Sequence, residues 1–419
     1  MPANSISRRR RRQAGQALPL IGLLLVLLIG FAGLVVDGGQ LAMQYRASQN
    51  AADAASLAAA TMVMNGSTEA QATARANVVA QHNQIPVADL SVAYYGSNGI
   101  ATTVAALVTQ VTATVSHQFP TLFLPIIGID SATVSASATA SVTQGNACVL
   151  CVMGNNNTTL KVGNGNVTVT GGNIVVNSTS QSALGVGPNG SLTDSSGPIY
   201  LVGNDNGANL NNIHSQVITG VPPVPDPFAS VPDPVVTGTR TCCSGGGTVT
   251  INPGIYSSIN LSGHQNVVMN PGVYVITGGI TATGNASLTG HDVMIYLACS
   301  HYPNSCASGG ESGASFTVSG NDTINISAPS YGTYHGMVLF ADRHNTSGIT
   351  LGGNGSTRFV GSIYDLSGNV TISGNGSGSN VNSKVVANQV TMNGNNGAIA
   401  INYTQSANYV VPNNLTLSN

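Results

Sequence analysis

Three short β-prone runs, separated by two sharp corners, make up the stretch ITATGNASLTGHDVMIYL at residues 280–297. In each run Val, Ile or Leu alternates with small polar residues, which places apolar side chains on one face of a strand. Gly284-Asn285 and Gly290-His291 fall between the runs, and Gly supplies the positive φ that a tight corner needs. Short strands with repeated corners are typical of a solenoid, in which each coil buries its apolar row against its neighbours.

The same pattern extends over residues 147–419. Related runs occupy 162–176, 316–327 and 364–380, and Asn252-Pro253-Gly254-Ile255-Tyr256 is nearly copied at Asn270-Pro271-Gly272-Val273-Tyr274. We therefore expect a mainly β chain whose larger part is a right-handed parallel β-helix. A β-sandwich is the alternative, although runs this short and rich in Asn fit it less well.

A Pro-rich insert, VPPVPDPFASVPDPVV, interrupts the repeats at residues 221–236. Its six prolines exclude a central strand, because Pro lacks the N–H that a ladder needs. The insert is either a linker between two halves or a loop strapped along the solenoid. Similar repeats on both sides favour the loop.

Composition limits the classes of function. Only 6% of the 419 residues are charged, the net charge is −2 and 42% are hydrophobic. This balance argues against disorder, which usually combines low hydrophobicity with high net charge. Five of the twelve basic residues are Arg8–Arg12, so the remaining chain has no basic footprint for nucleic acid.

An uncharged run of twenty residues, ALPLIGLLLVLLIGFAGLVV, occupies positions 17–36. A helix of this length spans about 30 Å, the thickness of a bilayer core. Because Arg8–Arg12 precede the run, the positive-inside rule predicts a cytoplasmic basic segment at 1–16 and a body on the outer side of the membrane. The alternative, a cleaved signal peptide, requires a shorter apolar core and a better cleavage site than Asp37-Gly38-Gly39.

The helix is expected to continue to residue 66, because Leu41–Val63 is rich in Ala and lacks Pro and Gly. The sequence of this extension favours equally a rigid stalk and a packing surface for sister helices.

Residues 14–60 resemble the N-terminal segment of the Flp pilus-assembly TadE/TadG-like family. The resemblance is carried by the apolar run and by flanking motif residues: Gly15, Gln16, Ala17, Asp37, Gly38, Asn50, Ala51, Ala52 and Asp53. It implies a pilin-like accessory protein of a bacterial tight-adherence (Tad) system, held in the inner membrane with its body in the periplasm or outside the cell. Other pilin-like Tad components would pack laterally against the helix. Processed pseudopilins carry a Glu five residues after the cleaved Gly, whereas the residue five after Gly15 is Leu20, which fits the TadG-like, membrane-retained branch.

A small α+β unit is expected over residues 67–146. Residues 68–82 predict a helix capped by Ser67 or Thr68, and 87–95, 101–116 and 131–142 predict strands. Six apolar residues in the segment before the last strand are expected in its core, with a membrane-surface loop as the alternative: Phe119, Leu122, Phe123, Leu124, Ile126 and Ile127.

All six cysteines fall on the predicted outer side, where disulfides form readily. Cys299 and Cys306 could close a small loop. Cys242 and Cys243 are neighbours and are expected to pair with distant partners, for which Cys148 and Cys151 are candidates. Free thiols, a redox Cys148-x-x-Cys151 motif and a zinc site are less favoured readings.

No catalytic, cofactor or metal site is predicted. Polysaccharide-cleaving β-helices need paired carboxylates, and a solenoid could align Asp292, Asp322 and Asp365. His335-Gly336 and Asp342-Arg343-His344 form the densest polar cluster, which we interpret as a turn. We therefore expect a structural or adhesive component of a Tad system and no enzyme. The alternatives are a membrane-tethered carbohydrate-active enzyme and a surface glycan-binding protein.

Overall fold

A computed structural model of the chain describes residues 17–65, 67–143, 148–243, 247–353, 355–374, 379–394, 397–410 and 414–418. The basic segment 1–16, with the predicted motif residues Gly15 and Gln16, lies outside them. The described residues form two compact units. Unit 1 takes those within 1–93, 111–141 and 415–419, and unit 2 those within 94–110 and 142–414. This division differs from the predicted domains at 67–146 and 147–419, because the last strand belongs to unit 1.

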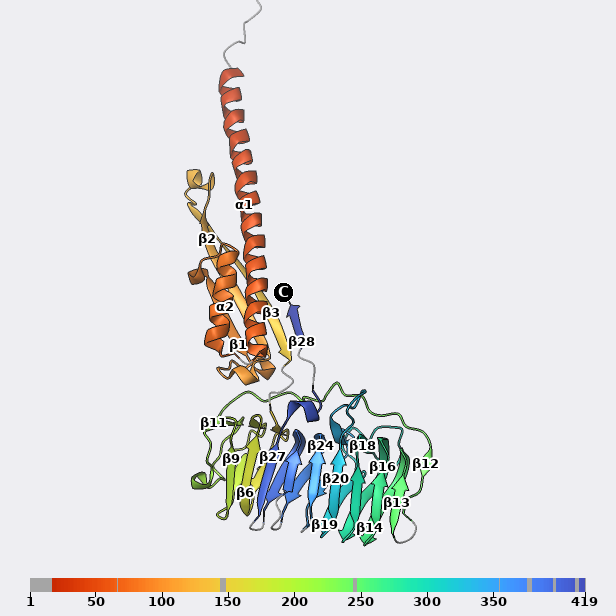
Figure 1. Cartoon of the computed structure of the whole chain (residues 1–419). Coiled ribbons are helices and arrows are strands. Elements are labelled where there is room, and N and C mark those ends of the chain that lie inside the picture. The colour runs from red at the N-terminus through yellow and green to blue at the C-terminus, as the bar shows by residue number, and fades with distance from the viewer. Residues whose placement is uncertain are drawn as a thin grey trace, which may run out of the picture. The chain divides into compact units, whose positions relative to one another are not determined.

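Unit 1 contains one long and one short α-helix, α1 (Ala17–Met64) and α2 (Glu69–His82). Helix α1 runs unbroken from the apolar run into the Ala-rich stretch, as predicted (Figure 1). Helix α2 begins with a capping box: the Gln71 N–H donates to Thr68 Oγ1, and the Thr68 N–H donates to Gln71 Oε1. The cap predicted at Ser67 or Thr68 is therefore Thr68. The described residues also form six short 3-10 turns. Two lie in unit 1, η1 (Val87–Asp89) and η4 (Leu124–Ile127), and four in unit 2: η2 (Ser97–Gly99), η3 (Ala105–Leu107), η5 (Leu210–Asn212) and η6 (Gln405–Ala407).

A four-stranded sheet completes this unit. Its strands lie in the order β1 (Leu90–Tyr95), β2 (Gln110–Pro120), β3 (Ser131–Thr143) and β28 (Asn414–Ser418). The strand predicted at 101–116 begins only at Gln110, because the residues before it turn locally: Thr102 Oγ1 accepts the Val104 N–H, and η3 follows.

The core of unit 1 is built from small side chains. Positions three and four apart on α1 are buried: Ser48, Ala51, Ala52, Ala55, Ser56, Ala59, Ala60 and Val63. They face their own chain, since Ala51 and Ala52 pack with Ala80 of α2, Val115 of β2 and Ala138 of β3. The Ala-rich face of this stretch of α1 is therefore covered by the protein's own unit, which a bare stalk would not be.

Most of unit 2 consists of parallel strands in two hydrogen-bonded sheets. The first sheet holds nine described strands in this order: β13 (Thr248–Ile251), β15 (Asn266–Met269), β17 (Ser287–Gly290), β20 (Thr323–Ser327), β23 (Thr357–Val360), β25 (Ser379–Asn382), β27 (Ala398–Asn402), β6 (Gly165–Thr170) and β9 (Gly190–Asp194).

The second sheet holds fifteen described strands. Its main path is β11 (Val217–Thr219), β10 (Ile199–Leu201), β7 (Ile174–Val176), β4 (Leu150–Val152), β26 (Val385–Asn393), β24 (Ser362–Ser373), β21 (Met337–Ala341), β18 (Val293–Leu297), β16 (Gly272–Gly284), β14 (Gly254–Gly263) and β12 (Thr239–Arg240). Long strands such as β16 and β26 also pair, through their second halves, with a further row: β19 (Ser315–Gly320), β22 (Ile349–Leu351), β5 (Leu160–Val162) and β8 (Leu184–Val186).

The strand order is not the sequence order. Strand β4 begins unit 2's run of strands yet pairs in parallel with β26, near the end of the run, with Leu150 opposite Val385. From β4 the row continues through β7 and β10 to β11, whereas the chain resumes at β12 on the opposite edge and returns to β26. In Figure 1 the blue C-terminal strands accordingly lie between the yellow-green and the cyan-green ones.

The corners of the stack depend on glycine, as predicted. Gly263, Gly284 and Gly320 occupy equivalent register positions in β14, β16 and β19, and all have positive φ. A Cβ on Gly320 would lie 2.8 Å from the backbone nitrogen of Gly284. Glycine is therefore required both by conformation and by the closeness of successive turns.

Candidate functional site

The Pro-rich segment forms a strap over one face of the second sheet (Figure 1, the green trace from β11 to β12). Its apolar side chains are buried on outward-facing strand residues: Val221, Val224, Phe228 and Val231 pack with Tyr200, Val175, Tyr296, Phe340 and Tyr364. The central strands of this sheet are consequently buried on both faces. The segment does not separate two halves as a linker would.

Hydrogen bonds attach the strap to successive strands along the row. Near its start, Val224 exchanges hydrogen bonds with the Asn177 side chain, 2.8 and 2.9 Å long. Farther on, Tyr364 Oη donates to Asp226 Oδ2 at 2.8 Å. Close to its end, the Val236 N–H donates to Tyr302 Oη at 2.7 Å. The strap is thus attached beside β7, on β24 and at the loop that follows β18.

The cluster Asp342-Arg343-His344 serves this attachment and a nearby loop. The Arg343 guanidinium donates to Asp233 Oδ1 at 2.8 Å and to three strap carbonyl oxygens, those of Phe228, Ala229 and Val231. Asp342 accepts from Tyr296 Oη at 2.9 Å and from the Cys306 N–H at 3.2 Å. Burial, followed by the charges of Asp233 and Asp342, raises the pKa of Tyr296. These groups bind one another, in accord with the interpretation as a turn.

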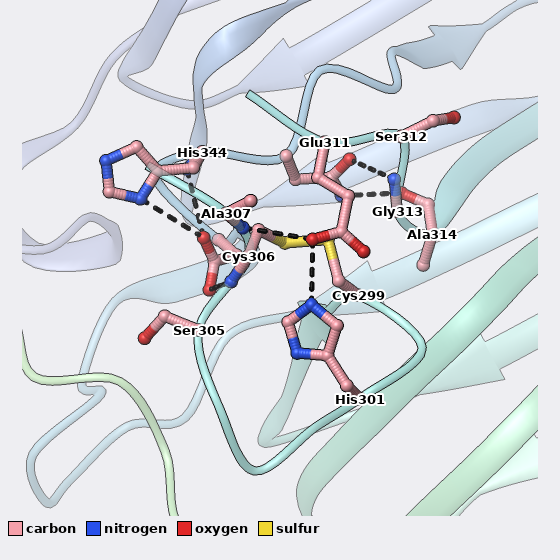
Figure 2. Close-up of a disulfide and its surroundings, with 12 residues drawn as sticks. Cys299, His301, Ser305, Cys306, Ala307, Glu311, Ser312, Gly313, Ala314 and His344 are labelled. Atoms are coloured by element: carbon pink, nitrogen blue, oxygen red, sulfur yellow. Dashed lines mark hydrogen bonds and ion pairs between the residues drawn. A yellow bond between two sulfur atoms is a disulfide. The ribbon is translucent and has the colours of Figure 1, made fainter. Parts of the chain in front are cut away.

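Cys299 and Cys306 are joined by a disulfide that closes the predicted small loop (Figure 2). Beside it, His301 Nε2 lies 2.7 Å from Glu311 Oε2, and the Ala307 N–H donates to the same carboxylate oxygen at 3.0 Å. The pKa of His301 is raised by its bond to Glu311, and that of Glu311 is lowered by the Ala307 N–H and by His301. The bonds of Glu311 to His301 and Ala307 thus hold the loop that the Cys299–Cys306 disulfide closes.

The other cysteines pair locally, contrary to the expected long-range pairing. Cys148 is joined to Cys151, and Cys242 to Cys243. Strand β4, which holds Cys151, is seven steps from β12 in the sheet, or about 34 Å at ~4.8 Å per step. A disulfide needs Cα atoms within about 7 Å, so this distance excludes the predicted partners.

The three carboxylates that a solenoid could align each accept a different backbone N–H. Asp292 Oδ1 accepts the Ser330 N–H at 2.8 Å, Asp322 Oδ1 the Ala286 N–H at 2.8 Å and Asp365 Oδ1 the Gly368 N–H at 3.0 Å. Burial raises the pKa of Asp365 to about 8. Burial also raises the pKa of Asp322. The hydrogen bonds from Ser330 lower the pKa of Asp292.

Helix α1 is the one helix in the described residues long and apolar enough to cross a membrane. Its most apolar 18-residue window has a mean hydropathy of 2.8, and only 6% of that window is buried. The core helix of a soluble protein would be mostly buried, so this exposure favours a membrane span or a signal sequence.

Asp37, one of the predicted motif residues, connects this helix to the loop between β2 and β3. Its side chain is buried, and its carboxylate accepts the N–H groups of Leu122, Phe123 and Leu124 at 3.0, 3.0 and 2.7 Å. One turn earlier, Gly33 is buried under the same loop, and a Cβ there would lie 2.7 Å from Phe123 Cβ. Sequence reasoning did not find this role, because the partners are backbone groups more than eighty residues away.

The predicted core of this loop is largely wrong. Phe119 is buried, but Leu122, Phe123, Ile126 and Ile127 are exposed and Leu124 is only half-buried. Phe119 belongs to β2 and points into the sheet's core, whereas the other five follow the strand and lie along α1. An apolar pattern cannot distinguish these two surroundings.

The remaining motif residues divide between core and surface. Ala51 and Ala52 are buried, Asn50 and Gly38 are exposed, and Ala17 begins α1. Gln49 Nε2 donates to Asp53 Oδ1 at 2.8 Å and to the Ser137 carbonyl oxygen at 3.3 Å, which joins α1 to β3. Most of the segment therefore fixes the helix within unit 1.

Comparison with known families places a match on this helix. Residues 15–63 match the Tad family model, described as "Putative Flp pilus-assembly TadE/G-like". The resemblance predicted for 14–60 is confirmed over that range. Neither a curated protein nor a solved structure matches the chain.

The Tad-like segment and α1 coincide almost residue for residue, since α1 ends at Met64. The match includes Asp37, Asn50 and the buried Ala51-Ala52 pair. It covers neither α2, nor the sheet of unit 1, nor the strands of unit 2. The family match thus associates the helix with Flp pilus assembly and leaves the body to be interpreted from its own residues.

Proposed function

We propose that this chain is a membrane-anchored accessory component of a tight-adherence (Flp/Tad) pilus assembly system, with a structural and adhesive role. The observation that carries the proposal is the Tad family match on the same residues as the exposed apolar helix. The anchor spans the inner membrane with the basic segment in the cytoplasm and the body in the periplasm or outside the cell.

The helix would meet other pilin-like components within the membrane. Its Ala-rich half is buried against its own unit, so lateral packing is confined to exposed residues between Leu20 and Tyr45. Gly22 and Gly30 have no neighbour within 4 Å in this segment, and small residues allow close helix approach in membranes.

Unit 2 is a right-handed parallel β-helix in this proposal. Support comes from parallel registers in all three rows of strands, from glycine corners in equivalent positions and from apolar side chains that form one interior cluster. On the outer face of the first sheet, Thr248, Asn266, Ser287 and Thr323 form a polar row in register. A flat, weakly charged row of this kind suits contact with a partner protein or a glycan.

A structural role is proposed in preference to a catalytic one. The carboxylates of Asp292, Asp322 and Asp365 each accept a different backbone N–H, whereas polysaccharide cleavage requires two carboxylates on either side of the same glycosidic bond. The polar cluster at Arg343 is engaged by the strap.

Removal of the chain from a bacterium that assembles Tad pili tests the proposal. We expect fewer surface pili and weaker adhesion to a solid surface, both restored by the intact chain. A variant with residues 17–63 replaced by an unrelated single-pass anchor should reach the membrane without restoring either. Cell fractionation with mass spectrometry of the N-terminus should find the intact chain, with Arg8–Arg12, in the inner membrane. Normal piliation and adhesion without the chain would refute the proposed role.

A further inference from the structure

The loop between β2 and β3, residues 121–130, exposes an apolar cluster that the unit's own fold does not cover. Ile126 is 80% exposed, Ile127 71% and Leu122 65%. Residues 118–129 carry no charged side chain. Contiguous large apolar side chains on a surface mark an interaction site, because their contact with water is unfavourable.

The loop lies beside the apolar run of α1. The helix and the loop enclose a groove of about 490 Å³ whose lining residues are all apolar, among them Val26, Phe31 and Leu34 from α1 and Ile126 and Ile127 from the loop. From Leu34 to Val26 the groove extends roughly 12 Å along the helix axis, at 1.5 Å per residue. It therefore lies at the level of residues that the anchor places inside the bilayer core.

Asp37 and Gly33 hold the loop at that level. The Asp37 carboxylate accepts three consecutive loop N–H groups, and Gly33 lets Phe123 approach the helix backbone. The loop therefore has a defined depth along α1.

The loop backbone is suited to a medium without water. In hydrocarbon an unpaired N–H costs several kcal/mol, so irregular segments seldom face lipid. Besides those bound by Asp37, four N–H groups have partners within the loop: Thr121 to Asp130, Ile126 to Phe123, Gly128 to Pro125 and Ile129 to Leu124, at 3.0–3.2 Å. Pro125 has no N–H, and Thr121 Oγ1 donates to the Ile129 carbonyl oxygen at 2.6 Å. A loop that faced water would not need this degree of internal pairing.

We propose that residues 121–129 insert into the bilayer beside α1, with lipid acyl chains filling the groove between them. The inference rests on the proposed membrane anchor. Absence of charge, internal pairing of the backbone and position beside the most apolar part of α1 all favour lipid over a folded partner. The insertion adds a second membrane contact to a single-span anchor and fixes unit 1 against the membrane surface.

The chain contains no Trp, so single Trp variants can report depth in the full-length protein. I126W and I127W probe the loop, L28W marks the anchor at the same level but outside the groove, and Y331W marks an exposed position of unit 2. Each is reconstituted in phosphatidylethanolamine–phosphatidylglycerol vesicles, with or without lipids brominated on the acyl chains. Soluble acrylamide serves as the aqueous quencher.

We expect bromolipid to quench I126W and I127W to within about twofold of L28W and to leave Y331W unchanged. Quenching of the loop variants by acrylamide alone, with L28W quenched by bromolipid, would overturn the loop insertion and leave the anchor intact. Protection of the loop from both quenchers, with L28W still quenched by bromolipid, would overturn it in favour of a protein covering the groove. If bromolipid does not reach L28W, the anchor itself fails and the loop insertion with it. Two loop positions guard against a folding defect in either variant.

Discussion

Replacement of Arg343 by Met should release the strap from the strands beneath it. Arg343 donates to Asp233 and to the carbonyl oxygens of Phe228, Ala229 and Val231. Its guanidinium carbon also lies 5.4 Å from the Phe340 ring centroid. Methionine keeps much of the aliphatic volume over that ring and removes every donor.

The magnitude follows from the kinds of bond that are lost. A hydrogen bond from a charged donor contributes about 1.5–3 kcal/mol, and two good carbonyl bonds give roughly 3 kcal/mol. The pair with Asp233 adds at most about 1 kcal/mol, because surface ion pairs contribute little. Local opening of the strap should therefore become about 3 kcal/mol easier, a roughly 100-fold rise in the open population.

Hydrogen exchange measures this opening directly. Within the strap, the N–H groups of Val224, Phe228 and Val236 donate to Asn177, Asp226 and Tyr302. The peptide that covers 221–238 should exchange faster in R343M, while peptides from β16 should keep their rate. The matched control is R358M, which removes an exposed Arg from β23 and should change neither. Equal strap exchange in R343M, R358M and the unmodified chain would refute the reasoning.

Three further predictions concern the body. D365N should lessen the loss of stability between about pH 4 and 8. Burial raises the pKa of Asp365 in the folded protein to about 8. Its contribution to the free energy of unfolding is therefore fully present below pH 4 and is lost as the pH rises through 8, on the order of 1 kcal/mol per pH unit. Parallel curves of melting temperature against pH for D365N and the unmodified chain would contradict this. G320A should destabilise unit 2 by about 1–3 kcal/mol, because Gly320 has a φ of 121° and a Cβ there would contact Gly284. The control is G309A, whose added methyl meets open space and which should melt like the unmodified chain. Equal melting temperatures for G320A and G309A would count against the glycine corner. A protease site inserted between the exposed Ala229 and Ser230 should be cut while the two fragments stay associated, because β26 of the second fragment still pairs with β4 of the first. Separation of the fragments on gel filtration under native conditions would disprove that strand order.

The sequence predicted much of the body's local structure because that structure depends on neighbouring residues. Alternation in 280–297 correctly indicated parallel strands. Of its two corner glycines Gly284 has the predicted positive φ, whereas at the second corner Asp292 has it in place of Gly290. Thr68 was recognisable as a cap from its own side chain and that of Gln71. The predictions of an apolar helix at 17–36 and of the Tad-like segment likewise rest on contiguous residues.

Features that depend on long-range pairing were not predictable. All strands share nearly the same alternation, so nothing in Leu150 or Val385 specifies that they pair. The expected pairing of Cys148 and Cys151 with Cys242 and Cys243 failed for the same reason, since the sequence does not show how many strands separate the two pairs.

The strand order has a physical rationale in how unit 2 is inserted into unit 1. The chain leaves unit 1 after β3 and returns as β28, and these two strands are neighbours in one sheet. An inserted body must therefore bring its two ends together, whereas a simple stack of coils places them at opposite ends. Here the Val149 carbonyl oxygen accepts the N–H of Val385, and the Asn408 side chain accepts the N–H of the adjacent Lys384 at 2.7 Å, so both ends meet at the start of β26.

The strap provides the long connection that this strand order requires. From β11 to β12 the strap spans ten strand spacings, about 48 Å, and the segment from Val221 to Thr239 could extend to roughly 59 Å. The Pro-rich composition then follows from its position, because a segment that crosses the outside of the strands has no ladder to join and loses nothing by lacking N–H groups.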